Sequence, residues 1–224
     1  MDQALLELCA ASIAFVGTHF ALSHPLRAPL VKAVGERGFM ALYSLVALAT
    51  LGWMALAFRA APTGDLGGSG VTGWVFASGL MIPALALFVG SFRGNPALPA
   101  PGAEMLAAKE PRGAFTITRH PMMWSFALWA LAHIALWWST RTLIVAAAIL
   151  VLALVGAHLQ DRKKEALMGA AWAGWEARTG FWPRLSGFAA LGWTHWLAAL
   201  ILWLAITGAH IPAGGIPAGI FHWL

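Results

Sequence analysis

The chain has little charge and almost no cysteine. Asp, Glu, Lys and Arg make up only 10% of its 224 residues, whereas soluble domains carry about 25%. Apolar side chains make up 60% of the residues, and the mean hydropathy is +0.73. This balance excludes a soluble globular protein and predicts an all-α integral membrane protein. The single cysteine, Cys9, excludes an intramolecular disulfide and a zinc site built from cysteines.

The few charged residues form neither ion pairs within the apolar segments nor a basic stripe. No apolar segment holds an Asp–Lys pair or a row of carboxylates, which argues against a proton-coupled transporter. The net charge of +5 is not arranged as a basic stripe with interleaved aromatic residues, so no nucleic-acid partner is predicted. Asp2 and Glu7 stand where the basic region of a signal peptide would lie, so no signal peptide is expected.

What the chain does contain is six long apolar segments. They lie at residues 4–23, 38–58, 72–92, 121–138, 142–159 and 187–208. Each has about the length that a helix needs to cross a bilayer, and only helices satisfy their own backbone there. The pattern therefore predicts a six-transmembrane-helix bundle forming a single domain over residues 1–224. Pro83 is expected to kink the third helix.

Basic residues collect in alternate connections. Twelve of the fourteen Lys and Arg residues lie in the first, third and fifth connections: Arg27, Lys32, Arg37, Arg93, Lys109, Arg112, Arg119, Arg162, Lys163, Lys164, Arg178 and Arg184. The positive-inside rule places these connections in the cytoplasm. We therefore expect a multi-pass protein of the bacterial inner membrane with both termini in the periplasm.

The fifth connection has a helical pattern of its own. Leu167, Ala171 and Trp175 recur at a spacing of four within residues 160–178, with Lys and Arg at other positions. This pattern predicts one cytoplasmic amphipathic helix lying on the inner leaflet. Residues 93–111, rich in Pro, Gly and Ala, indicate an ordered or half-ordered connection, and the repeated IPAG of the tail indicates an outer loop.

The ionisable residues of the apolar segments are nearly all histidines. His19 and His120 are expected at the same depth, near the cytoplasmic face, whereas His133 lies about 20 Å deeper along the helix. Two imidazoles without nearby carboxylates or thiolates suit a haem iron, so a haem between His19 and His120 is predicted. The alternative is that each histidine hydrogen-bonds a neighbouring helix. His133 is expected to face a cofactor or substrate cavity.

The Arg119–His120–Pro121 sequence indicates a helix start beside a cation. Pro121 suits the first helical position, and Thr118 or Thr116 is expected to cap the helix. Free amides and Arg119 would then bind an anion, such as a propionate, a phosphate or a cofactor carboxylate. A phospholipid head group is an equally suitable partner.

Four stretches resemble the NnrU family of bacterial membrane proteins. They are THFALSHPLR at 18–27, GERGFMALYSLVAL at 35–48, TRHPMMWSFALWALAHI at 118–134 and DRKK at 161–164. The resemblance implies a link to nitrite and nitric oxide metabolism in denitrifiers. It extends to the plant and cyanobacterial 15-cis-zeta-carotene isomerase, a haem b protein, and implies that His19 and His120 match haem ligands. The chain differs from the isomerase at two places. It has one extra residue before Arg27, and Met122 follows His-Pro.

A looser resemblance is to isoprenylcysteine carboxyl methyltransferases. It rests on RHP opening a helix and on the basic segment that ends in the FWPR turn at 181–184. It implies that Arg119, His120 and Glu165 hold S-adenosylmethionine. Met122-Met123-Trp124 replaces the expected tyrosine, and Lys164–Glu165 replaces an acidic doublet.

Three functions follow from these observations. The first is a haem protein with isomerase-like chemistry on an apolar small molecule, or with a nitric-oxide-linked role. The second is a membrane methyltransferase that uses S-adenosylmethionine. The third is a non-catalytic accessory factor of a respiratory complex, in which the histidines only pack. In each case the lipid bilayer is the expected surrounding.

Overall fold

The structure, a computed structural model, describes residues 2–98 and 102–224. These residues form helices and connections and contain no strand. The α-helices are α1 (Gln3–Ser23), α2 (Arg27–Ala60), α3 (Gly70–Gly90), α4 (Ala103–Ala107), α5 (Pro121–Leu136), α6 (Thr140–Met168), α7 (Ala170–Arg178) and α8 (Trp193–Gly214). Short 3-10 helices are η1 (Gly113–Thr116), η2 (Leu185–Ala190) and η3 (Gly219–His222).

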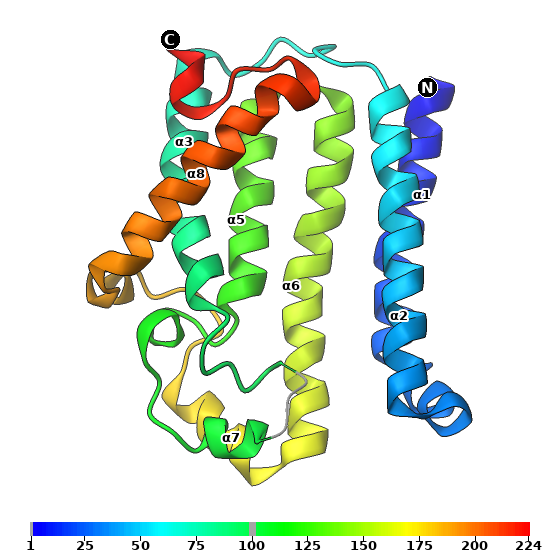
Figure 1. Cartoon of the computed structure of the whole chain (residues 1–224), viewed down its shortest axis with the longest axis vertical. Coiled ribbons are helices and arrows are strands. Elements are labelled where there is room, and N and C mark those ends of the chain that lie inside the picture. The colour runs from blue at the N-terminus through cyan, green and yellow to red at the C-terminus, as the bar shows by residue number, and fades with distance from the viewer. Residues whose placement is uncertain (1, 99–101) are drawn as a thin grey trace.

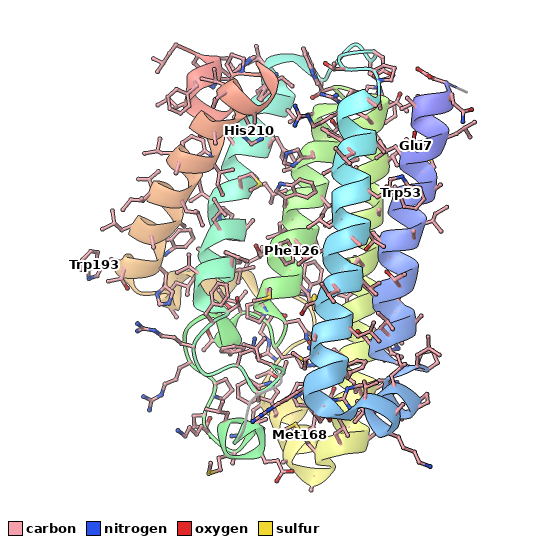
Figure 2. The ribbon with its side chains drawn as sticks, turned by 45° about the vertical axis from the view of Figure 1, so that its right-hand side comes forward. Glu7, Trp53, Phe126, Met168, Trp193 and His210 are labelled. Carbon is pink, nitrogen blue, oxygen red and sulfur yellow. The ribbon has the colours of Figure 1, made fainter. Side chains whose placement is uncertain are left out.

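The long helices run side by side between two ends of the molecule (Figure 1). Both chain termini lie at one end, here called the terminal end. The α1–α2 turn and α7 lie at the opposite end, here called the basic end because most Lys and Arg residues are in its connections. Helix α5 packs between α3 and α6, and α8 packs on the α3 side. Helix α1 lies between α2 and α6 and contacts both. Figure 2 shows the same bundle with its side chains.

Five of these helices are long and apolar enough to cross a membrane: α1, α2, α3, α6 and α8. The prediction of a helical membrane protein is therefore confirmed. The fourth predicted segment forms α5, which has only 16 residues and is not among the five. The last span begins at Trp193 instead of 187, because residues 185–190 form the 3-10 helix η2. The tail prediction was partly wrong, since α8 continues through Pro212 to Gly214.

Local backbone signals define the ends of α5. The helix starts at Pro121, as predicted, and ends where Trp137 takes a left-handed conformation with φ of 48°. The predicted caps are wrong, because the first turn has no side-chain cap. The Thr116 hydroxyl donates instead to the Gly113 carbonyl at 2.8 Å. Helix α3 continues through Pro83 as a single helix, and the kink expected there stays a prediction.

The predicted amphipathic helix over 160–178 is divided in two. Gly169, with φ of 50° and ψ of −121°, ends α6 and begins α7. Leu167 is 62% exposed, whereas Trp175 is buried with Trp172 against Phe115. The apolar side of α7 therefore packs on the connection before α5, and Leu167 does not share that face. The prediction read Gly169 as an ordinary helical residue, which its dihedral angles exclude.

Candidate functional site

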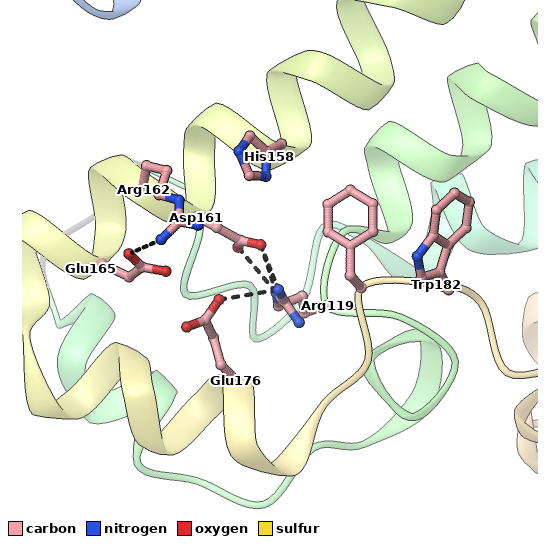
Figure 3. A pocket seen from close by; sticks show the side chains of 8 residues that line it. Arg119, His158, Asp161, Arg162, Glu165, Glu176 and Trp182 are labelled. Carbon is pink, nitrogen blue, oxygen red and sulfur yellow. Dashed lines mark hydrogen bonds and ion pairs between the residues drawn. The ribbon is translucent and has the colours of Figure 1, made fainter.

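A buried ion pair joins the start of α5 to the basic end of α6. The Arg119 Nη2 lies 2.6 Å from Asp161 Oδ2, and Nε donates to both carboxylate oxygens at 3.1 and 2.9 Å. The side chains are only 13% and 6% exposed. Figure 3 shows this pair at the centre of the site. Two charges so far from water require this mutual contact, because an unpaired buried charge is costly.

His120 completes the arrangement around the same carboxylate. Its Nε2 lies 2.7 Å from Asp161 Oδ1, and its side chain is fully buried. Because an ionised carboxylate only accepts hydrogen bonds, the imidazole proton must sit on Nε2. The Nδ1 atom is then a buried lone pair with no hydrogen-bond partner among the residues that the structure describes. Asp161 therefore fixes both the arginine and the orientation of the imidazole.

Backbone contacts with the FWPR turn hold the RHP segment. The Arg119 amide donates to the Gly180 carbonyl at 2.8 Å. The Thr118 hydroxyl and the Trp124 indole N–H both donate to the Phe181 carbonyl, at 2.7 and 2.8 Å. These bonds join residues about 60 positions apart in the chain, so they bring the start of α5 under the turn that follows α7.

Glu176 of α7 supplies a second carboxylate. Its Oε1 lies 3.1 Å from the Arg119 Nη2, and its side chain is 24% exposed. Burial raises the pKa of the Glu176 carboxyl above its ordinary value, and the nearby Arg119 opposes this effect. Arg119 is thus shared between two acidic groups, one buried and one open to solvent.

Arg119, Asp161 and Glu176 line a pocket of about 380 Å³. Its walls are Arg119, His158, Asp161, Arg162, Glu165, Glu176, Phe181 and Trp182. One face of α6 supplies four of them, at relative positions 0, 3, 4 and 7, which a helix brings to one side. Charges of both signs thus face two aromatic rings in one cavity (Figure 3). This size falls within the range of small-molecule sites, about 300–1,000 Å³.

The residues predicted from the sequence fall in three places. Arg119 and His120 meet at Asp161, and Glu165 lines the same pocket. His19 lies on α1, where its Nδ1 is 2.7 Å from the Phe15 carbonyl. Its ring makes an edge contact with Tyr43, at 5.6 Å between centroids. His133 lies toward the terminal end, where its Nδ1 is 2.8 Å from the Trp129 carbonyl.

The surroundings of His120 do not fit an axial haem ligand in this arrangement. Its Nε2 is bound to Asp161, and its Nδ1 is enclosed by protein atoms. Within the described ranges, no group of three or more His, Cys, Asp or Glu side chains could hold a metal ion. Haem binding by this pair therefore stays a prediction that this geometry does not support.

Asp161 and Glu176 are the site residues that sequence reasoning missed. In the sequence, Asp161 is only the first residue of the DRKK stretch, and Glu176 only one residue of the predicted amphipathic helix. The spacing of His158, Asp161 and Glu165 on one side of a continuous helix was the available signal for the first. No local pattern marks Glu176, because its role depends on the turn of the chain at Gly169.

The fold and the site define a class of protein: a multi-helix membrane protein with a charged pocket at one end. Residues 7–218 match the family described as NnrU protein. The chain belongs to the NnrU family. Neither a curated protein nor a solved structure matches it in the corresponding comparisons.

Proposed function

We propose that the pocket at the basic end binds S-adenosylmethionine and that the protein is a membrane methyltransferase. The observation that carries this proposal is the pocket wall itself, which combines arginines, carboxylates and aromatic rings. A ligand complementary to that wall has an anionic group, a cationic group and a flat ring. S-adenosylmethionine has all three: a carboxylate, an amine with a sulfonium, and an adenine.

Each part of the ligand has a partner of suitable chemistry. The Nη1 of Arg119 donates no hydrogen bond to any residue in the described part of the chain, so it remains available to a carboxylate. Glu176 keeps one oxygen free of Arg119 and would accept the amine. Trp182 is 68% exposed and would stack on the adenine, since indole rings favour such contacts.

The chemistry would be a direct displacement at the methyl carbon. The acceptor's lone pair forms the new bond to that carbon while the carbon–sulfur bond breaks, leaving S-adenosylhomocysteine. The acceptor's proton would pass to His158, which lines the pocket and lies about one turn nearer the middle of α6 than Asp161. Positioning supplies most of the effect in such a reaction, and the pocket's buried ion pair keeps its wall rigid.

The proposal includes six membrane crossings, with α5 counted as one. The basic end would face the cytoplasm of a bacterial inner membrane and both termini the periplasm, in accordance with the positive-inside rule. The cytoplasmic side is where S-adenosylmethionine is made, so the pocket would open toward its supply. An apolar acceptor would reach the pocket from the bilayer.

Calorimetric titration of the detergent-purified protein with S-adenosylmethionine tests the proposal. We expect one site per chain, and weaker binding in Trp182→Ala and Glu176→Gln. Trp193→Ala is the matched control, since Trp193 is 73% exposed at the start of α8 and lies outside the pocket wall. Binding should weaken on acidification as Glu176 becomes protonated, at a higher pH than for an ordinary carboxyl because its pKa is raised.

Two results would overturn the proposal. The first is a colourless protein that binds no S-adenosylmethionine, which would favour an accessory role. The second is a purified protein from haem-replete cells that shows a haem spectrum lost in His19→Ala and binds no S-adenosylmethionine. That spectrum would favour a haem protein instead.

A further inference from the structure

A second, smaller cavity lies toward the terminal end, between α3, α5, α8 and η3. Its volume is about 50 Å³. Its lining includes Trp74, Met81, Trp129, His133, Trp203 and His210, and contains no Asp, Glu, Lys or Arg. Two imidazoles from different helices therefore face one apolar cavity. The pocket at the basic end shares none of these residues.

Backbone contacts fix the tautomer of both imidazoles. The His133 Nδ1 lies 2.8 Å from the Trp129 carbonyl, and the His210 Nδ1 lies 2.7 Å from the Ile206 carbonyl. Because a carbonyl oxygen only accepts, both Nδ1 atoms must carry the proton. Both Nε2 atoms are then lone pairs. Metal-binding histidines in proteins have this same arrangement, with the other ring N–H donated to a carbonyl or carboxylate.

A thioether lies in the same cavity. Met81 is on α3, whose first residues lie at the terminal end, whereas α5 and α8 run toward that end (Figure 1). Helical side chains tilt toward the N-terminus of their own helix. Met81 therefore points toward the terminal end, and His133 and His210 point back into the bundle. All three residues line the cavity, and Figure 2 shows His210 in the last turns of α8, beside α3.

We propose that His133, His210 and Met81 bind a single Cu(I) ion. Thioether and imidazole donors suit Cu(I), whereas divalent hard cations prefer carboxylates, which this lining lacks. A monovalent ion also costs less to place among apolar side chains than a divalent one. The rings of Trp74, Trp129 and Trp203 surround the cavity and add attraction for a cation.

Anaerobic competition against the chromogenic chelator bicinchoninate tests this site. The whole protein in detergent should remove one Cu(I) per chain from the chelator. Met81→Leu and His210→Gln should each lower the copper affinity at least about tenfold. Changing a residue that only supports a metal ligand already lowers affinity about 10- to 100-fold, so loss of a ligand should cost no less. X-ray absorption of the loaded protein should show a sulfur neighbour that disappears in Met81→Leu.

Two matched variants control for nonspecific binding. Met105→Leu removes a methionine that is 71% exposed in α4, and His24→Gln removes a histidine that does not line the cavity. Met105→Leu should bind copper as the natural protein does, and so should His24→Gln, which removes a histidine of the α1–α2 turn at the opposite end of the molecule (Figure 1). Because Met81→Leu conserves side-chain volume, this variant should fold, and a normal melting temperature will show that it does. Unchanged copper binding in folded Met81→Leu and His210→Gln proteins, or no binding by the natural protein, would overturn the proposal.

Discussion

At the scale of single residues, Asp161 organises the basic end. It accepts hydrogen bonds from Arg119 and His120, which the sequence marked as a candidate site. The sequence could predict that Arg119 and His120 lie at a helix start, because Pro121 makes that position recognisable. It could not predict their partner, because a carboxylate 41 positions away becomes a neighbour only through the packing of α5 on α6.

Asp161→Asn should destabilise the protein strongly. The amide has the volume of the carboxylate but no charge, so Arg119 would keep a buried charge without its main counter-ion. Breaking a buried pair in this way costs about 3–5 kcal/mol. Thermal unfolding in detergent, followed by circular dichroism, measures the effect as a fall in melting temperature.

The pair formed by Arg162 and Glu165 gives the control for this prediction. Its atoms lie 3.1 Å apart, but the side chains are 65% and 37% exposed. Exposed pairs contribute about 0–1 kcal/mol, so Glu165→Gln should melt close to the natural protein. Equal melting temperatures for Asp161→Asn and Glu165→Gln would show that the buried pair does not stabilise the fold.

At the scale of elements, apolar length predicted where the helices lie but not where each ends. The centres of all six apolar segments are helical. Two of the errors fall at glycines: Gly169 divides the predicted amphipathic helix, and Gly192 precedes the true start of α8. Hydropathy carries no information about backbone dihedral angles, and a glycine is compatible with both a helix and a break.

Gly169→Ala tests whether this break depends on glycine. A side chain at φ of 50° and ψ of −121° is strained, by about 1–3 kcal/mol, so the melting temperature should fall. Gly174→Ala is the matched control, because Gly174 is in the middle of α7 with no atom within 4 Å of an added Cβ. That variant should be more stable by about 0.5–1 kcal/mol. Stabilisation by both alanines would mean that α6 and α7 can form one continuous helix.

At the scale of the whole molecule, contacts at both ends of α3 show that α5 and the residues just before it together run the length of α3. The Ser69 amide, just before α3, donates to the Leu136 carbonyl at the end of α5. At the other end, a Cβ on Gly90 would lie 2.7 Å from the Ala114 Cβ, seven residues before α5 begins. Helix α5 is about 24 Å long by its 16 residues, short for a bilayer of about 30 Å. The connecting residues 114–120 therefore cover the remaining distance beside α3.

This arrangement predicts the sidedness of three positions. Between Lys109 and Leu224 the chain passes through α5, α6 and α8, so the two lie on opposite sides only if α5 crosses the membrane with the others. Single cysteines at Thr63, Lys109 and Leu224, in a Cys9→Ala background, can be labelled with a membrane-impermeant maleimide. In bacterial spheroplasts we expect labelling at positions 63 and 224, and at position 109 only in inverted vesicles. Labelling of positions 109 and 224 from the same side would show that α5 does not cross. Labelling of position 109 in spheroplasts, with positions 63 and 224 protected, would place the charged pocket outside, away from any cytoplasmic supply of S-adenosylmethionine.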